Sequence, residues 1–205
     1  MFDFLFAQYS EYPTHQIFLK ITAVFFGLLS VWYAKKNNIL VFPTGLISTA
    51  IYVYLLWKWG LLGDMTINIY YVIMSVYGWY HWSRKKNEVV AFPISTTTKK
   101  EQLWAWSLFF ASMIFVVFIY NYFDKFTSWT AYVDTLTTGI FFAAMWLMAK
   151  RKLENWILWI IGDIISIPLY FYKGYTFTSI QYIIFTIIAV YGYLEWNKIK
   201  HKKNN

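Results

Sequence analysis

The sequence predicts an all-α membrane protein with seven transmembrane helices, in which two parallel three-helix repeats flank a linker helix (3+1+3). Three observations lead to this prediction. First, the 205-residue chain is 59% hydrophobic and only 14% charged, whereas soluble domains carry about 25% charged residues. Second, its apolar runs are long and nearly free of charge. Third, the last three runs repeat features of the first three. Together these observations exclude an ordinary soluble domain.

Seven apolar segments can be identified, each 17 to 21 residues long. A helix of that length crosses the roughly 30 Å of bilayer hydrocarbon. Because backbone groups in lipid must be satisfied within the segment, helix is the expected state of each one. The segments are Ile17–Ala34, Ile39–Trp57, Asp64–Trp82, Leu103–Phe123, Trp129–Ala149, Trp156–Tyr172 and Thr178–Trp196.

The internal repeat is clearest where the third and seventh segments end. Val76–Trp82 reads VYGWYHW, and Val190–Trp196, 114 residues later, reads VYGYLEW. One segment separates the two triplets, so both triplets cross the membrane in the same direction and the repeats are parallel. The chain is therefore expected to contain an N-terminal segment (1–16), a first repeat (17–82), a loop with the linker helix (83–128), a second repeat (129–196) and a basic tail (197–205).

Basic residues follow alternate segments. The connections after segments one, three, five and seven contain most of the 18 Lys and Arg residues. The positive-inside rule then predicts a multi-pass membrane protein with its N-terminus outside and its C-terminus in the cytoplasm. The net charge of +8 could instead indicate nucleic-acid binding. We do not expect it, because the clusters are short and divided among several loops. Met1–Glu11 has no basic region of a cleavable signal.

The composition also limits the chemistry of the protein. The chain has no Cys and three scattered His residues, so disulfides and thiolate metal sites are excluded and a His-only metal site is not expected. Neither a metal nor another cofactor is predicted.

Polar and aromatic side chains enter the sixth segment directly after a basic run. They are Asn155, Trp156, Trp159, Asp163, Ser166 and Tyr170, and the last five share one helix face at i, i+3, i+7, i+10 and i+14. Asp163 lies roughly 10 Å into the segment at ~1.5 Å per residue. A charge at that depth costs about 2.5–3.5 kcal/mol on the mildest scale and should face a partner or a wet cavity. This face is therefore predicted to line a substrate site.

Other candidates add polar atoms to the remaining segments. Asn68 and Gln181 occupy nearly equivalent places in the two repeats, and their amides favour a lining role, although helix packing is an alternative. Asp134 and Thr44 are further candidates, and exposure of Asp134 to water stays open. Indoles bind planar and cationic rings, and no Lys or Arg lies deep in the segments. The predicted ligand is therefore a planar, neutral or cationic ring compound without phosphate.

A protein of another class, an intramembrane enzyme or a receptor, is the alternative. Gly63-Asp64 and Gly162-Asp163 both contain Gly-Asp, as a paired-aspartate protease would. The two carboxylates are expected at different depths, whereas a dyad sharing a proton needs them about 3 Å apart. No P-loop is present. No catalytic residue is predicted, and a receptor would bind its ligand without transport.

The chain resembles the PnuC family of vitamin transporters over residues 17–196. The resemblance rests on the order of several short matches. In the first triplet these are Gly27-Leu28, Val31, Lys36, Asn38, Pro43-Thr44-Gly45, Gly60, Gly63-Asp64, Asn68, Tyr71 and Gly78-Trp79-x-x-Trp82. In the second triplet they are Asn155-Trp156-x-x-Trp159, Asp163, Gln181-Tyr182 and Tyr191-Gly192-Tyr193-x-x-Trp196.

This resemblance implies a SWEET-like fold and facilitated diffusion of nicotinamide riboside across a bacterial inner membrane, after which a cytosolic kinase traps the riboside by phosphorylation. It also implies that Asn155, Trp156 and Trp159 contact the pyridine ring. Relatives carry thiamine or riboflavin on the same scaffold, so a uniporter of either vitamin is the alternative substrate assignment. In one departure from symmetry, the middle helix of the second triplet opens with Asn155-Trp156 instead of the Pro-x-Gly of the first. A homo-oligomer is left open.

Overall fold

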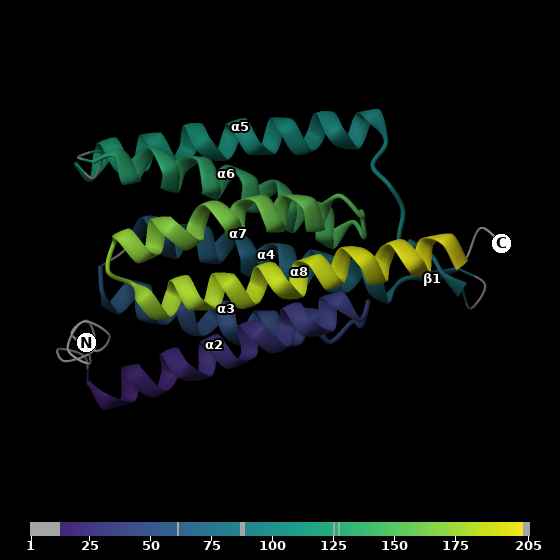
Figure 1. Ribbon diagram of the computed structural model, residues 1–205, viewed down its shortest axis with the longest axis horizontal. Helices are drawn as coiled ribbons and strands as arrows, with labels where there is room; N and C mark the ends of the chain where they lie inside the picture. Colours follow the sequence, from purple (N-terminus) through teal and green to yellow (C-terminus); the bar gives the residue numbers. More distant parts are fainter. Residues whose placement is uncertain (1–12, 61, 87–88, 125, 127, 203–205) are drawn as a thin grey trace.

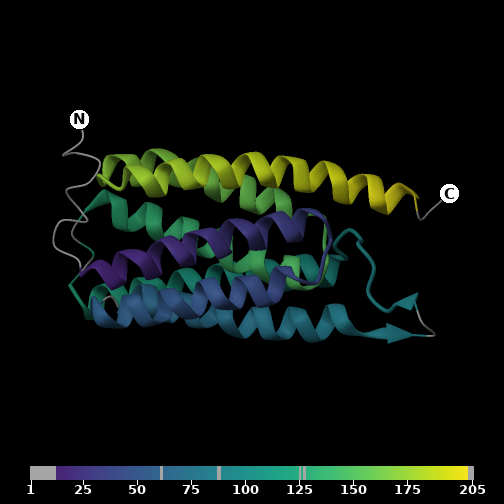
Figure 2. The same cartoon turned by 90° about the horizontal axis from the view of Figure 1, so that it is seen from below.

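In the part of the chain that the structure describes, seven helices form a bundle, and they run side by side along the long axis of the molecule (Figures 1 and 2). A computed structural model describes residues 13–60, 62–86, 89–124, 126 and 128–202. Within them the helices are α2 (Thr14–Lys35), α3 (Val41–Lys58), α4 (Leu62–Ser83), α5 (Lys99–Tyr122), α6 (Trp129–Ala149), α7 (Asn155–Tyr172) and α8 (Thr176–Lys202). A small hairpin, β1 (Lys85–Lys86) with β2 (Val89–Val90), follows α4. The all-α prediction is confirmed. Of the predicted N-terminal segment, residues 1–12 lie outside the described part.

Each predicted segment corresponds to one helix, with ends that differ by a few residues. α5 begins at Lys99, before the predicted Leu103, because Thr98 caps it. The Thr98 hydroxyl accepts from the Glu101 N–H, and the Glu101 carboxylate accepts from the Thr98 N–H. α8 continues to Lys202, so part of the predicted basic tail is helical.

Length and hydropathy qualify six of the described helices as membrane spans, all except α4. α4 has 22 residues, as many as α2. Its hydropathy is lower because Asn68, several tyrosines and His81 interrupt the apolar sequence. These are the residues expected where a helix faces protein and not lipid.

The helix contacts have the pattern of two equivalent triplets. α3 packs on α2 and α4, and α7 packs on α6 and α8. The first helix of each triplet contacts the third helix of the other, α2 with α8 and α4 with α6, while α5 packs mainly on α6. Such reciprocal contacts are expected of two parallel repeats related by a two-fold axis along the bundle.

Side chains at one end of the bundle repeat this symmetry. The Trp82 indole donates to the Ala149 carbonyl at 3.1 Å, and the Trp196 indole donates to the Ala34 carbonyl at 2.9 Å. Each Trp lies in the part of its triplet's third helix that reaches the basic connections, and each donates to the first helix of the other triplet. Because both indoles are buried, each bond satisfies an indole N–H that would otherwise lack a hydrogen-bond partner.

Two glycines make this end close-packed. A Cβ at Gly78 would lie 2.3 Å from the Phe42 ring, and a Cβ at Gly192 would lie 2.7 Å from the Trp156 ring. Phe42 and Trp156 are themselves 114 residues apart, so the repeat predicted from sequence is visible in the packing.

The predicted basic connections lie at the same end. α2, α4, α6 and α8 finish there, and α5 and α7 begin there (Figure 1). We refer to it as the basic end. The charge pattern of the sequence therefore corresponds to a polarity of the bundle.

Candidate binding site in the second triplet

The predicted face of α7 is divided between two environments. Trp156 is 1% exposed and belongs to the core of the basic end, where its ring lies edge-on to Trp196 with centroids 5.5 Å apart. Trp159, about one turn further along α7, is half-buried and stacks on Phe141 from α6. The part of the α7 face that leads into the bundle therefore begins at Trp159.

Four aromatic rings follow one another from Trp159 towards the opposite end of α7. Phe141 stacks on Trp159 with centroids 5.3 Å apart, and Phe141 lies nearly parallel to Tyr182 from α8 at 6.1 Å. Tyr182 in turn stacks on Tyr170 at 5.1 Å. These separations fall in the range of offset stacking. We call Trp159, Phe141, Tyr182 and Tyr170 the aromatic ladder.

Gly162 allows the ladder to form. A Cβ at this position would lie 2.3 Å from Phe141 Cε1, closer than real atoms approach, so only glycine lets Phe141 lie flat against α7. Phe141 is 8% exposed and fills the space beside the helix. The ladder thus depends on one large and one small residue on adjacent helices.

Asp163 places a carboxylate beside the ladder. Its side chain is 3% exposed and lies close enough to Tyr71 of α4 and to Tyr182 to interact with both electrostatically. Tyr182 also lies close to Ser166, whose buried hydroxyl has no hydrogen-bond partner in the described part of the chain. Among the described residues no Lys or Arg forms an ion pair with Asp163. A buried carboxylate without a cation is costly, so this position favours a ligand that brings positive charge or hydrogen-bond donors.

Asn155 and Trp156 present two unsatisfied polar atoms at the start of α7. The Asn155 amide donates to the Lys152 carbonyl at 2.6 Å, but its Oδ1 atom is buried without a hydrogen-bond partner, as is Trp156 Nε1. A buried polar group without a partner costs about 1–3 kcal/mol. One free acceptor and one free donor on consecutive residues therefore favour a bound water or a polar ligand group there.

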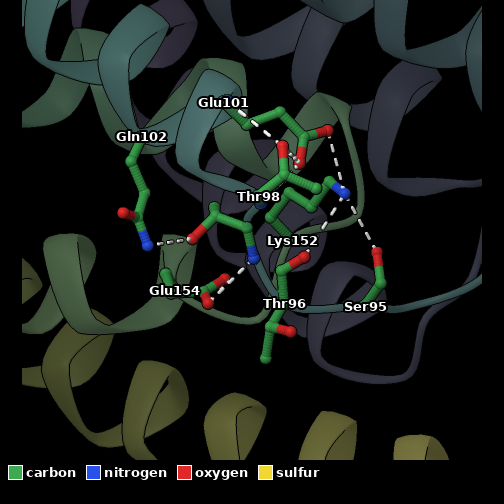
Figure 3. Close-up of polar contacts among 8 residues, drawn as sticks. Ser95, Thr96, Thr98, Glu101, Gln102, Lys152 and Glu154 are labelled. Carbon is green, nitrogen blue, oxygen red and sulfur yellow. Dashed lines mark hydrogen bonds and ion pairs between the residues drawn. The ribbon is translucent and has the colours of Figure 1, made fainter.

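Contacts from Ser95, Thr97 and Glu101 hold the turn that precedes Asn155, and we call this set of contacts the clamp (Figure 3). The backbone of Ser95 pairs with Arg151 and Leu153, and the Thr97 N–H donates to Glu154 Oε1 at 2.9 Å. Lys152 donates to Ser95 Oγ at 3.1 Å and pairs with Glu101 at 2.9 Å. The connection before α5 thus fixes the position of the first residues of α7.

Arg151 strengthens the same clamp. It donates from Nη1 to the Phe92 carbonyl at 3.0 Å, and its guanidinium lies 4.1 Å from the centre of the Trp82 ring. Burial lowers the pKa of Arg151 to about 10, so the side chain remains a cation at neutral pH and can hold both contacts.

The other predicted site residues lie elsewhere. Asn68 is half-buried and donates to the Asp64 carbonyl of its own helix at 3.0 Å. The Thr44 hydroxyl donates to the Leu40 carbonyl at 2.6 Å, and Asp134 pairs with Lys173. Gln181 is half-buried beside Tyr182 in the sequence of α8. The geometry therefore brings Trp159 and Asp163 together, whereas Thr44 and Asp134 use their polar atoms within the protein.

The two Gly-Asp carboxylates have different surroundings. Asp64, in the first turn of α4, interacts with Asp134 and Lys173, whereas Asp163 interacts with Tyr71 and Tyr182. This separation agrees with the expectation that they form no dyad. Among the described residues, no group of three His, Cys, Asp or Glu side chains could hold a metal ion.

The sequence did not identify Phe141, Tyr71 or Tyr182 as site residues, although Tyr71 and Tyr182 are among the matches of the family resemblance. One signal was available for Phe141. With the triplets aligned 114 residues apart, Phe141 and Gly162 stand where the first triplet has Gly27 and Ser48. The second triplet thus has a large side chain on its first helix where the first triplet has a glycine. This difference in side-chain size marks the place where the two halves differ.

Comparisons with known proteins agree with this architecture. A family model described as "Nicotinamide mononucleotide transporter" matches residues 17–198. The nicotinamide riboside transporter PnuC of Escherichia coli (strain K12) is 25% identical over 197 residues, covering 83% of this chain and 81% of the relative. PnuC of Haemophilus influenzae is 27% identical over 98% of this chain and 89% of its own length.

Two further matches concern substrate range and fold. The riboflavin/roseoflavin transporter RibM of Streptomyces davaonensis is 26% identical over 84% of this chain and 88% of its own length. A structure described as "Crystal structure of the Vitamin B3 transporter PnuC" superposes with a TM-score of 0.69 at 24% identity, covering 96% of this chain and 86% of that chain. The fold is therefore shared with a solved transporter.

Proposed function

Because the chain belongs to the nicotinamide mononucleotide transporter family and is a multi-pass membrane transporter for a vitamin, we propose that it carries nicotinamide riboside across the bacterial inner membrane by facilitated diffusion. Phosphorylation by a cytosolic kinase then traps the riboside, because the added phosphate prevents its return through the same site. In this proposal the basic end faces the cytoplasm, which places the N-terminus outside.

The observation that carries the proposal is the aromatic ladder with Asp163 beside it. The nicotinamide ring of the riboside is a planar cation. Aromatic faces attract such a ring, and a buried carboxylate without a cationic partner compensates its charge. The free Asn155 Oδ1 and Trp156 Nε1 atoms match the donors and acceptors of a carboxamide or of ribose hydroxyls.

The same site argues for the riboside over the phosphorylated mononucleotide that the family description names. Phosphate is bound by Arg and Lys through charge-assisted hydrogen bonds. None of the residues of the ladder is basic, and Asp163 would repel a phosphate at this depth. Selection against phosphate is also what trapping requires, since a carrier that accepted the mononucleotide would release it.

Binding requires the ladder to open. A substrate ring needs about 3.5–4.0 Å to the aromatic ring on each side, and Phe141 now occupies the space between Trp159 and Tyr182. In the proposed mechanism Phe141 leaves that space when the nicotinamide ring enters. The sequence contains no P-loop, so the concentration difference that the kinase maintains drives uptake.

Calorimetric titration of the purified protein with nicotinamide riboside, nicotinamide mononucleotide, thiamine and riboflavin tests the substrate assignment. We expect saturable binding of the riboside and no binding of the mononucleotide. If only thiamine or riboflavin binds, that vitamin replaces the riboside as the assigned substrate, and the proposed binding site is unchanged. The RibM relative and the stacking surface make riboflavin the second candidate. Binding of the mononucleotide in preference to the riboside contradicts the proposal.

Uptake into proteoliposomes tests the mechanism. Labelled riboside should equilibrate and not accumulate, at the same rate with and without a proton or sodium gradient. Asp163 makes this control necessary, because carboxylates inside membranes often relay protons. Accumulation driven by either gradient would refute facilitated diffusion, and binding without any flux would indicate a receptor.

A further inference from the structure

A groove at the basic end lies apart from the aromatic ladder. It has a volume of about 810 Å³ and is lined by residues of α4, of the first half of α5 and of the end of α6. Its apolar wall includes Met74, Trp104, Leu108 and Trp146. Neither the proposed transport site nor the symmetry of the triplets accounts for this groove.

The groove exists because α5 and α6 diverge. Near the middle of α6 they are in close contact, since a Cβ at Gly139 would lie 2.9 Å from both Phe109 and Met113. From there α6 runs away from α5 towards the basic end (Figure 1). The groove follows α5 from Thr98 to Ala111, which is roughly 20 Å at 1.5 Å per residue. That length is close to one bilayer leaflet with its headgroups, about half of 40–45 Å.

The charged mouth of the groove is positive. Lys100 and Lys150 both line it, and neither takes part in the ion pairs of the described residues. The Lys150 amine lies 6.0 Å from the centre of the Tyr77 ring, a contact that leaves its positive charge uncompensated. Glu101 also lines the groove, but Lys152 neutralises it at 2.9 Å. Two uncompensated cations thus stand at one end of an apolar channel.

We propose that this groove binds one anionic phospholipid, with its phosphate between Lys100 and Lys150 and an acyl chain along Trp104 and Leu108. The polarity of the groove matches that of a lipid in the leaflet at the basic end, with cations at headgroup level and apolar residues deeper. Lysines near that surface attract anionic lipids. The lipid fills the space between α5 and α4 and thereby joins the linker helix to the first triplet.

Native mass spectrometry of the detergent-purified full chain tests this proposal with phosphatidylglycerol, phosphatidylethanolamine and glycerol 3-phosphate as separate probes. We expect one phosphatidylglycerol to remain bound at concentrations that leave phosphatidylethanolamine unbound, and no retention of glycerol 3-phosphate. Equal retention of both phospholipids, or retention of glycerol 3-phosphate at the same site, overturns the proposal of an anionic lipid.

Matched variants locate the site. Lys100→Gln with Lys150→Gln should weaken phosphatidylglycerol binding about 30-fold, because each surface lysine contributes roughly fivefold. Lys85→Gln with Lys198→Gln removes the same charge from exposed positions at the basic end and should change binding less than twofold. If the two double variants lose the same amount of phosphatidylglycerol affinity, the lipid responds to the overall charge of the surface and not to this groove, which overturns the proposed site.

Ala111→Trp gives an independent test that leaves both lysines in place. Ala111 is exposed at the deep end of the groove, so the indole should block the acyl chain without disturbing the packed side of α5. We expect lipid retention to fall while the affinity for the vitamin is unchanged. Unchanged lipid retention, or a dimer that forms in the wild type and is lost in this variant, overturns the proposal and assigns the groove to an interface between copies of the chain.

Discussion

The two triplets share a scaffold but differ in the size of their side chains at equivalent places. At the basic end they are alike, since Trp82 and Trp196 each donate to a carbonyl near the end of the first helix of the opposite triplet. Deeper in the bundle, α2 and α3 meet through small residues. A Cβ at Gly27 would lie 3.2 Å from Ser48 Oγ. At the same step in the second triplet, Phe141 covers Gly162.

The difference extends along the middle helix. In the first triplet a Cβ at Gly45 would lie 3.0 Å from Ser30 Oγ, and the Ser30 hydroxyl donates to the Val41 carbonyl at 2.8 Å. The residue equivalent to Gly45, 114 positions later, is Trp159. In the first triplet, small residues and internal hydrogen bonds therefore let the helices pack directly on one another. The second triplet has aromatic side chains and a carboxylate at the equivalent places. Symmetry maintains the fold, and the departure from symmetry creates the candidate site.

The largest effect that would separate the triplets is expected from Trp159→Ala. Loss of one stacking surface typically costs about 1–3 kcal/mol for a planar ring, so the affinity for nicotinamide riboside should fall up to about 100-fold. Trp106→Ala, which removes an exposed indole from α5, is the control and should bind as the wild type does. Titration calorimetry measures both. If Trp159→Ala binds nicotinamide riboside with wild-type affinity, the aromatic ladder is not part of the binding site.

Asp163→Asn should have the next largest effect. It removes the negative charge beside the ladder while keeping the shape, and a hydrogen bond to a charged group contributes about 1.5–3 kcal/mol. We expect the affinity to fall about 30-fold. The equivalent residue, Thr49, donates to the Gly45 carbonyl of its own helix at 2.9 Å, so Thr49→Val should leave binding unchanged. Equal losses in the two variants would mean that both triplets contribute alike.

Gly162→Ala should weaken binding about fivefold and destabilise the fold, because its Cβ displaces Phe141 towards Trp159 and Tyr182. Overpacking of this kind costs roughly 1–3 kcal/mol. Ser48→Ala at the equivalent position loses the hydrogen bond to the Ala23 carbonyl at 2.7 Å but should keep full affinity. Adding Phe141→Leu to Gly162→Ala should restore thermal stability, and a failure to do so would show that the strain lies elsewhere.

The smallest effects on ligand binding are expected at the basic end, where the two triplets pack alike. Trp82→Phe and Trp196→Phe each remove one buried indole together with the hydrogen bond that it donates, and such a bond typically contributes about 0.5–1.5 kcal/mol. Melting temperatures in detergent should fall by similar amounts, with the affinity for the riboside unchanged. A much larger fall for one variant would contradict the symmetric packing of the basic end.

Part of this comparison was predictable from the sequence. Hydrophobic length and charge spacing predict the seven helices, and the cost of burying Asp163 predicts that α7 faces the interior. Periodicity assigns residues to a helix face but does not identify their neighbours. It therefore placed Trp156 and Trp159 on one face, although Trp156 packs against Trp196 and Trp159 stacks on Phe141.

Phe141 could not be selected on chemistry alone. A phenylalanine is ordinary in a membrane span, and its role follows only from its contact with Gly162 on another helix. In the same way, the early start of α5 depends on the reciprocal hydrogen bonds of Thr98 and Glu101, which a hydropathy profile does not register.

An experimental structure of the complex with nicotinamide riboside tests the central claim most directly, because it shows which triplet holds the ring. We predict the nicotinamide ring against Trp159, with Phe141 displaced and the carboxylate of Asp163 directed at the ligand. A ring bound in the first triplet, against the Gly45 and Ser48 side of α3 with the ladder intact, would contradict the account.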